Sequence, residues 1–237
     1  MLGTGTSITQ AAVRLLSQAG VMIGFCGGGG TPLLAGTDVE WFCPQSEYRP
    51  TQYVQGWLYF WYDASKRLEG AKSFQRARCS YLEKVWSSDR ELQDEGFYPD
   101  DIAVESALGE YRKKINQARN VQELLSAEAH FAKKLYKYAA INTGYDDFVR
   151  DTSGADATNR LLNHGNYLAY GMAASVLWVL GIPHGFALMH GKTRRGALVF
   201  DVADLIKDIL VLPWAFICAA NGDSHQEFRT KCLEKFV

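Results

Sequence analysis

One histidine and three aspartates in the last third of the chain have the residue types and the spacing to bind a metal ion. Asp201, Asp204 and Asp208 follow His190 closely, and on a helix the three carboxylates would share one side. Imidazole nitrogen together with carboxylate oxygen suits Mg²⁺ or Mn²⁺, which keep several water ligands. Such an ion can stabilise the charge of an in-line displacement at a phosphate. The alternative interpretation of the same residues is a solvated helix face and a hydrogen-bonded loop histidine.

Basic residues accompany this acidic run and suit a phosphodiester backbone. Lys192, Arg194 and Arg195 precede the aspartates with no acid among them, and Lys207 lies within the acidic stretch. Lysine and arginine bind phosphate oxygens through charge-assisted hydrogen bonds, so we expect these four side chains to hold DNA around the site. Arg78 and other bases upstream are further candidates for backbone contacts, without base specificity.

Glu128 is a further candidate site residue, because it is a carboxylate on an apolar helix stripe. A helix predicted over Gln122–Ala140 places Glu128 with Phe131 and Leu135 on the face that should be buried. A buried carboxylate without a partner is costly, so something must neutralise it. A metal ion, a buried salt bridge or a position at the edge of the stripe would each serve, and this segment alone leaves the three open.

The elements that must position these residues are mainly helices. Apolar residues recur every three or four positions over Thr51–Ser87, which predicts one long helix or two helices broken near Gly70. Ala103–Ala118 predicts a further helix. Ala197–Phe200 is apolar and is expected to be extended, leading to Asp201 as the cap or first residue of a helix.

A long helix predicted over Asp156–Leu180 is rich in small residues, so neighbouring helices should approach it closely. Its N-terminal end is polar and includes Arg160. Because helix starts attract anions, Arg160 is a candidate contact to a DNA phosphate. Helix capping and solvation explain the same polar residues equally well.

The beginning of the chain differs from the rest in composition. Ile8–Gln18 predicts a helix and Val21–Cys26 a short buried strand, whereas Gly27–Gly30 is more typical of a turn than of a phosphate loop, because no Lys-Ser or Lys-Thr pair follows. A strand needs neighbours. We therefore expect a mainly α protein, in which residues 1–48 are the tail of a larger β-containing domain and residues 49–237 form a helical domain.

Composition and charge exclude several classes of protein. The 237 residues are 47% hydrophobic and 22% charged, which is typical of a packed globular protein and excludes a disordered or low-complexity chain. No apolar run reaches the roughly 18 to 20 residues of a membrane helix. The five cysteines form no CxxC pair and no secretory leader is visible, so we expect thiols in the core of a cytoplasmic protein.

Several motifs in register resemble the catalytic subunit of the CRISPR spacer integrase, closest to its subtype I-F branch. The resemblance covers essentially the whole chain and is strongest over Asn159–Asp208, where Asn163–Gly171, Gly181–Gly185 and Val199–Asp204 follow the order of the family. It implies a divalent ion, Mg²⁺ or Mn²⁺, held by three residues that the pattern of charges also singles out. These metal ligands are Glu128, His190 and Asp204.

The resemblance adds further residues to the catalytic site. Asp201 matches another acidic position of the family's active site, which makes it a catalytic residue beside the three ligands. Three positions match residues that the family places near the site or the DNA: Tyr170, Lys192 and Lys207.

The function implied by the resemblance is that of a metal-dependent DNA endonuclease and integrase of CRISPR adaptation, which joins the 3′-hydroxyl ends of short foreign double-stranded DNA to the CRISPR repeat by transesterification. The resemblance also implies that residues 1–48 are the remnant of a small β-rich dimerisation domain, and that residues 49–237 are an α-helical catalytic domain that is incomplete at its C-terminus. The family works as a homodimer with a small integrase partner subunit, fused in this subtype to a helicase-nuclease, and without a membrane. Two alternatives remain at this point: a metal-dependent nuclease that only hydrolyses DNA, and a non-catalytic nucleic-acid-binding scaffold.

Overall fold

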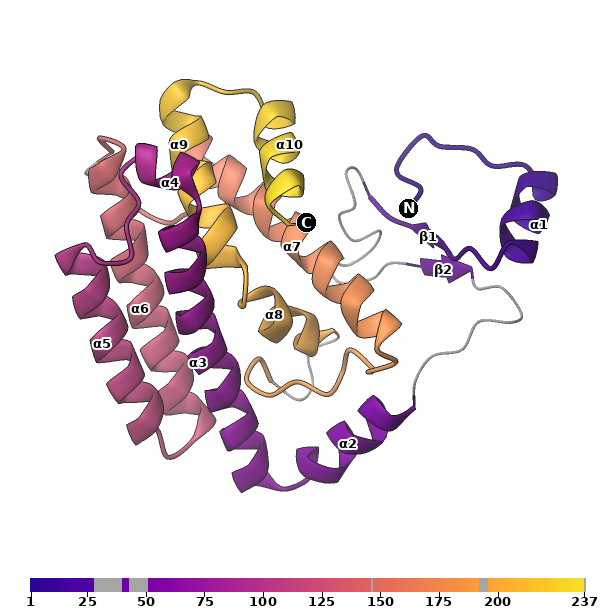
Figure 1. The fold of residues 1–237 in the computed structure, drawn as a ribbon, viewed down its shortest axis with the longest axis horizontal. Coiled ribbons are helices and arrows are strands. Elements are labelled where there is room, and N and C mark those ends of the chain that lie inside the picture. The colour runs from indigo at the N-terminus through magenta and orange to yellow at the C-terminus, as the bar shows by residue number, and fades with distance from the viewer. Residues whose placement is uncertain (28–39, 43–50, 146, 192–195, 237) are drawn as a thin grey trace.

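Helices account for most of the computed structural model, which describes residues 1–27, 40–42, 51–145, 147–191 and 196–236 (Figure 1). In the N-terminal part, α1 (Gln10–Gln18) precedes an antiparallel pair of strands, β1 (Ile23–Phe25) and β2 (Glu40–Phe42). The helices that follow in chain order are α2 (Gln52–Trp61), α3 (Ala64–Ser88), α4 (Arg90–Asp94), α5 (Ile102–Gln117), α6 (Val121–Asn142), α7 (Ala157–Val179), α8 (Ala197–Ala203), α9 (Leu212–Asn221) and α10 (His225–Lys235). A π-helical turn, Lys207–Val211, lies between α8 and α9.

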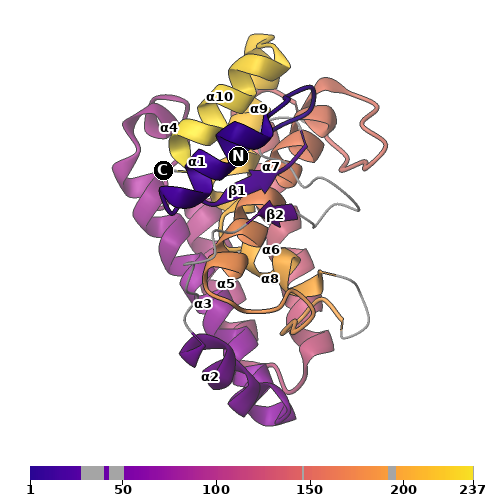
Figure 2. The same ribbon diagram turned by 90° about the vertical axis from the view of Figure 1, so that its right-hand side faces the viewer.

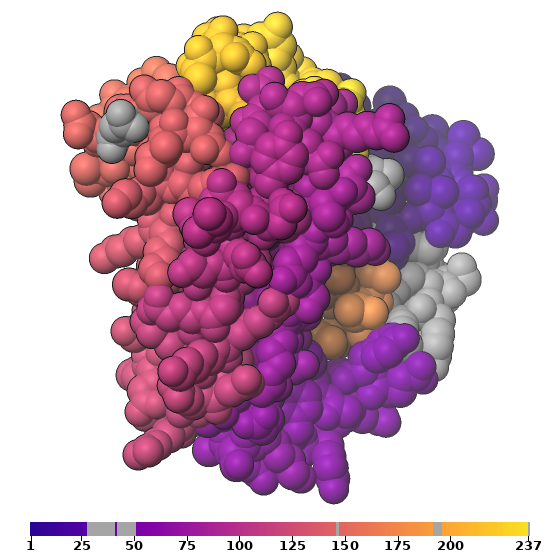
Figure 3. Space-filling view, turned by 60° about the vertical axis from the view of Figure 1, so that its left-hand side comes forward, coloured from indigo at the N-terminus to yellow at the C-terminus, as the bar shows by residue number. Residues whose placement is uncertain are grey.

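The helices surround α8, which lies between α3 and α7 (Figure 1). Helices α3, α5 and α6 lie side by side and form one outer face of the molecule. Figure 3 shows this face turned toward the viewer. Helices α9 and α10 pack on α7 at one end, and α2 lies at the other end (Figure 1). The mainly α fold predicted from the sequence is confirmed.

The N-terminal strands lie beside α7, as Figure 2 shows from the side. The ring of Trp41 in β2 stacks on Trp178 of α7, with centroids 4.6 Å apart. Ile23 and Cys26 are buried, and Leu2 forms an isolated parallel β-bridge with Phe25. The division into residues 1–48 and 49–237 stays a prediction, and the glycines at positions 28–30 lie outside the described residues.

The chain breaks between α2 and α3 at Asp63, and the predicted break near Gly70 is wrong. The side chain of Asp63 accepts hydrogen bonds from the backbone N–H groups of Ser65 and Lys66, at 2.9 and 3.1 Å, and so caps the start of α3. Gly70 lies within α3, where a Cβ would meet the ring of Phe60 at 3.3 Å. This glycine therefore permits the close approach of α2 to α3 instead of interrupting the helix.

The segment Ala197–Phe200 is helical and forms the start of α8, so the prediction of an extended strand leading to a cap at Asp201 is wrong. Gly196, with a φ of +67°, precedes the helix, and Asp201 lies inside it. The apolar run misleads because all four of its residues are buried, and a short buried run has no amphipathic period to distinguish a helix from a strand.

The helices predicted around the site are confirmed in α5, α6 and α7. In α7 the small residues do bring neighbours close, because a Cβ on Gly165 would lie 2.4 Å from Val211 of the π-helical turn. Four cysteines of the described residues are free and buried, as predicted: Cys26, Cys79, Cys218 and Cys232. No helix in the described part of the chain is long and apolar enough to cross a bilayer.

Candidate acidic active site

Asp201 holds the loop that carries His190. Its carboxylate, buried within α8, accepts backbone hydrogen bonds from Leu188 at 2.6 Å, Met189 at 3.1 Å and His190 at 3.2 Å. The Nδ1 atom of His190 lies 2.7 Å from the same carboxylate. Because Nδ1 is engaged by Asp201, the ring is fixed and its Nε2 atom is the one left to face the rest of the site.

Asp204, one turn along the chain from Asp201, lies opposite that Nε2 atom. Its Oδ1 is 2.5 Å from the ammonium group of Lys207, and its Oδ2 is 3.6 Å from Nε2 of His190. Oδ2 is buried and has no hydrogen-bond partner. A buried carboxylate oxygen without a donor is costly, so this atom marks a position that a cation would stabilise.

Glu128 lies on α6 and is joined to the site through Arg78 of α3. One terminal nitrogen of the Arg78 guanidinium is 3.1 Å from Glu128, and the other pairs with Asp208 of the π-helical turn. Gln75 accepts a hydrogen bond from Arg78 at 3.2 Å and another from the hydroxyl of Tyr111 at 2.7 Å. Of the three interpretations of Glu128 from sequence, the structure shows the salt bridge.

The electrostatics of His190 and Asp204 reflect their contacts. Burial opposes the charged imidazolium, but the hydrogen bond with Asp201 and the negative charge of Asp204 outweigh it and raise the pKa of His190. Burial likewise opposes ionisation of Asp204, but Lys207, Arg78 and His190 together hold the pKa of Asp204 below its ordinary value. Asp204 is therefore an ionised carboxylate at neutral pH.

The electrostatics of Glu128 connect it to both aspartates. Burial raises the pKa of Glu128, Arg78 opposes this shift, and the charges of Asp204 and Asp208 add to it. Burial works against the charge of Arg78, but Asp208, Glu128 and Asp204 together raise its pKa well above the ordinary value. The four side chains thus form one interacting charge cluster.

The donor set suits a hard divalent cation. His190 Nε2 and the unpartnered oxygen of Asp204 face each other, and Glu128 would supply a second carboxylate oxygen, the mixture that Mg²⁺ and Mn²⁺ accept. Within the residues that the structure describes, no three His, Cys, Asp or Glu side chains are already grouped closely enough to hold a metal ion. Two donors are in place, and Glu128 is engaged by Arg78.

Helix α2 anchors the loop before His190, a relationship that the sequence analysis missed. The indole N–H of Trp57 donates to the carbonyl of Phe186 at 3.0 Å, and that of Trp61 donates to Ala187 at 2.8 Å. The only signal in the sequence was that these two tryptophans belong to a helical stripe of apolar residues, which was interpreted as part of the core. Their polar N–H groups need partners when buried, and a loop carbonyl is one such partner.

The predicted DNA contacts differ in their surroundings. Arg160 is exposed in the first turn of α7, with a hydrogen bond of 3.5 Å to the carbonyl of Ala155. Tyr170 is half-buried against Phe200, and the ammonium of Lys207 lies 5.5 Å from the centre of its ring. The other three, Lys192, Arg194 and Arg195, lie outside the described residues.

Arg78 is buried, which contradicts its predicted contact with the DNA backbone. Its side chain is 1% exposed and is held by Glu128 and Asp208 inside the helical core. The prediction is wrong because Arg78 lies on the same helical face as the apolar residues of α3, where Cys79 and Leu82 are also buried. Its position in the core makes it part of the acidic site.

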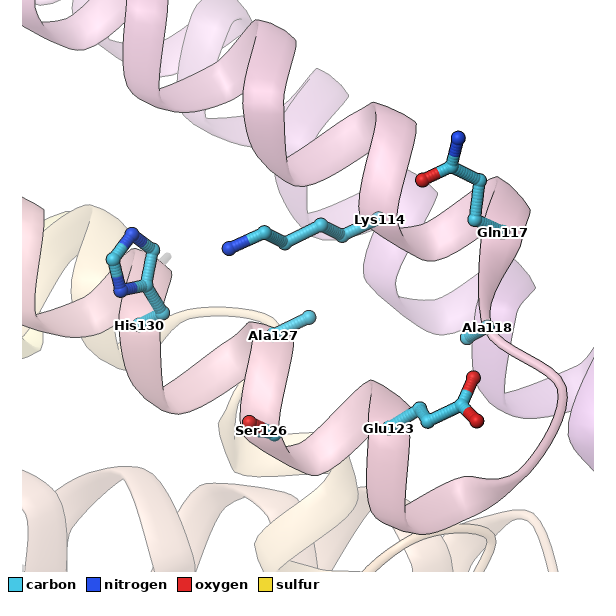
Figure 4. Close-up of a pocket in the computed structure, with 7 residues that line it drawn as sticks. All are labelled: Lys114, Gln117, Ala118, Glu123, Ser126, Ala127 and His130. Atoms are coloured by element: carbon cyan, nitrogen blue, oxygen red, sulfur yellow. The ribbon is translucent and has the colours of Figure 1, made fainter.

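A polar cavity lies between α5 and α6 and is separate from the acidic cluster. Its volume is about 360 Å³, and Figure 4 shows Lys114 extending toward His130 across it, with Glu123 near the other end. Ala127 lines the cavity, whereas the next residue, Glu128, contacts α3. The cavity and the acidic cluster therefore lie on different faces of α6.

Comparison with known proteins identifies close relatives along the whole chain. Residues 1–232 match the family described as CRISPR associated protein Cas1. A protein of Pseudomonas aeruginosa (strain UCBPP-PA14), named CRISPR-associated endonuclease Cas1, is 56% identical over 240 residues, which cover 99% of this chain and 74% of the relative. A protein of the same name from Pectobacterium atrosepticum is 52% identical over 242 residues, covering 100% of this chain and 74% of the relative.

Solved structures share the fold at lower sequence identity. A casposase bound to integration product superimposes with a TM-score of 0.65 at 17% identity, covering 97% of this chain and 66% of that one. At this level of identity the likeness concerns the arrangement of the helices.

Proposed function

This chain belongs to the CRISPR associated protein Cas1 family, and from that premise we propose that it is a divalent-metal-dependent DNA endonuclease and integrase of CRISPR adaptation. The proposed reaction joins the 3′-hydroxyl ends of short foreign DNA to the CRISPR repeat. The observation that carries the proposal is the buried, unpartnered oxygen of Asp204, 3.6 Å from Nε2 of His190. A cation placed there would satisfy both groups.

The proposed chemistry is a transesterification at phosphorus. The 3′-hydroxyl oxygen forms a new P–O bond and loses its proton, while the bond from phosphorus to the 3′ oxygen of the repeat strand breaks and that oxygen takes up a proton. No covalent intermediate with the enzyme is needed. Mg²⁺ or Mn²⁺, when bound, would polarise the phosphate and stabilise the charge that develops on its oxygens.

The residues of the chain have separate tasks in this proposal. His190, Asp204 and Glu128 would hold the ion, and Asp201 keeps the His190 ring in place by binding both Nδ1 and the loop backbone. Lys207 neutralises one oxygen of Asp204 and leaves the other oxygen free. Asp201 is accordingly a positioning residue and not a ligand.

We propose that DNA and partner proteins complete the assembly. The phosphate contacts would come from Arg160, Lys192, Arg194 and Arg195, with Tyr170 and Lys207 at the edge of the site. The expected form is a homodimer with a small integrase partner subunit, fused to a helicase-nuclease, acting on DNA in the cytoplasm. Membership of the family and the match of nearly all of this chain to 74% of the Pseudomonas and Pectobacterium relatives support this arrangement.

The test follows the fate of the short DNA and its joining to the plasmid. A short duplex that is labelled at its 5′ ends and has free 3′-hydroxyl groups is incubated with a repeat-containing plasmid, the partner subunit and Mn²⁺ or Mg²⁺. The proposal predicts label joined to the plasmid in branched or longer products, only when the ion is present. Shorter labelled strands alone would identify a nuclease that only hydrolyses, and DNA binding with neither product would identify a non-catalytic scaffold.

A further inference from the structure

Arg78 is a buried cation at the centre of the acidic cluster. It reaches from α3 to Glu128 on α6 and to Asp208 on the π-helical turn, so one guanidinium connects three separate elements of the fold. Its side chain is 1% exposed. Burying an arginine so fully is unfavourable unless its charge is balanced, and here two carboxylates balance it.

The guanidinium is also held by neutral side chains. Gln75 accepts one of its N–H groups and is itself held by the hydroxyl of Tyr111, and the ring of Phe131 lies 5.7 Å from the guanidinium carbon. A side chain held in this way cannot swing out to meet a phosphate. Its charge acts only inside the core, on the groups around it.

Those groups carry more negative than positive charge. Glu128, Asp204 and Asp208 contribute three carboxylates, whereas Arg78 and Lys207 contribute two permanent cations. Without Arg78, the carboxylate of Glu128, whose side chain is 18% exposed, and that of the buried Asp208 would lose the cation that lies between them. They would repel one another in an environment that screens charge poorly.

We propose that Arg78 is the built-in counter-ion of the acidic site: it keeps Glu128 and the aspartates together while no divalent ion is bound, and it lowers the affinity of the site for that ion. The inference rests on the proposed function, because it concerns the same ligands. It explains why the described His and acidic side chains are not yet grouped around a metal position, since Glu128 is paired with Arg78.

The consequence is a competition for Glu128. In the arrangement described here, Arg78 takes one oxygen of Glu128, and Glu128 becomes a full ligand only by sharing or releasing that contact. The pair with Asp208 then retains Arg78 in the core, so its charge is never left without a partner. A neutral side chain at position 78 should therefore favour ion binding and lower the stability of the metal-free protein.

Mn²⁺ itself is the probe for this inference. Isothermal calorimetry gives its dissociation constant, and the melting temperature with and without Mn²⁺ gives its effect on stability. We expect Arg78→Met to lower the melting temperature of the metal-free protein and to bind Mn²⁺ roughly tenfold more tightly or better. Mn²⁺ should then raise the melting temperature of this variant by more than it raises that of the parent. Arg112→Met is the matched control, because Arg112 forms a two-hydrogen-bond pair with Glu83, away from the acidic site.

A double variant keeps the test decisive if Arg78→Met does not fold. Arg78→Met combined with Asp208→Asn removes one positive and one negative charge together, so the core stays balanced while Glu128 is released. It should bind Mn²⁺ more tightly than Asp208→Asn alone. Equal or weaker Mn²⁺ binding in the Arg78 variants, with the parent binding normally, would overturn the counter-ion role and leave the proposed function intact. A parent that binds no Mn²⁺ would overturn both.

Discussion

The Nδ1 atom of His190 lies 2.7 Å from Oδ1 of Asp201, and the same carboxylate accepts three backbone N–H groups of the loop that ends at His190. One buried side chain thus fixes both the path of the loop and the orientation of the ring. This relationship gives Asp201 a role that sequence alone did not distinguish from that of Asp204.

Asp201→Asn should damage the site without removing a ligand. The amide replaces one acceptor oxygen with an N–H₂ group that faces other donors, so some of the loop hydrogen bonds are lost. Groups that orient a metal ligand contribute about 10- to 100-fold to metal affinity or activity. We expect Mn²⁺ affinity, measured by calorimetry, to fall by that factor. An unchanged affinity would show that the ring of His190 is positioned by other contacts.

Trp61→Phe tests the anchoring of the same loop from outside. The substitution keeps an aromatic ring against Phe186 but removes the indole N–H that donates to Ala187. Loss of one such hydrogen bond costs about 1 kcal/mol of unfolding free energy, and the loop before His190 loses an anchor. Urea unfolding measures the cost, and strand transfer should decline with it. Tyr59→Phe, on a side chain that is 80% exposed in the same helix, should leave both unchanged.

Gly165 and Gly109 provide a matched pair for the packing of the helices. A Cβ on Gly165 would lie 2.4 Å from Val211 and 2.9 Å from Phe228, whereas a Cβ on Gly109 meets nothing within 4 Å. Gly165→Ala should cost about 1 to 3 kcal/mol, because α7 must move away from the π-helical turn that carries Asp208. Gly109→Ala should stabilise the protein by about 0.5 to 1 kcal/mol. Equal effects in chemical denaturation would mean that α7 is not closely packed there.

The sequence predicted those parts of the fold whose signal is periodic. The helical pattern of Gln122–Ala140 and the long helical segment Asp156–Leu180, which is rich in small residues, predicted α6 and α7. The first pattern also placed Glu128 on the face that should be buried. Residues 197–203 carry no such period, because every residue of α8 except the partly buried Val202 is buried, and its helical state depends on the elements packed around it. Only the fold shows that Asp201 lies inside this helix.

The sequence could predict which residues belong to the candidate site, but not which side chains pair with one another. The spacing of His190, Asp201 and Asp204 and the position of Glu128 on an apolar helix stripe singled out these residues. The family resemblance then grouped Glu128, His190 and Asp204 as one predicted set of metal ligands. Arg78 could not be assigned in the same way, since it lies far from these residues in the sequence and only the packing of α3 against α6 and the π-helical turn brings it to them. Contacts between distant segments are not visible in local patterns.

Glu110 should give the α5–α6 pair a measurable pH dependence. Hydrogen bonds from Lys114 and Lys134 lower the pKa of Glu110 from 4.5 to about 2. A carboxyl whose pKa is lower in the folded state stabilises the fold fully above the unfolded value, and this contribution disappears as the pH falls from 4.5 toward 2. The difference in melting temperature between the parent and Glu110→Gln should therefore shrink over that range. A difference that is constant with pH would show that the ion pairs contribute nothing.

The most direct test of the account is Mn²⁺-dependent strand transfer by the parent protein and by His190→Ala and Asp204→Asn, with the partner subunit present and folding confirmed by circular dichroism. Arg112→Met serves as the control, since it removes a charged side chain outside the acidic cluster. We predict that both site variants lose joined product by at least about a hundredfold while still binding DNA, and that the control retains it. Joined product from either site variant at the level of the parent would contradict the assignment of His190 and Asp204 as the centre of a metal-dependent DNA integrase.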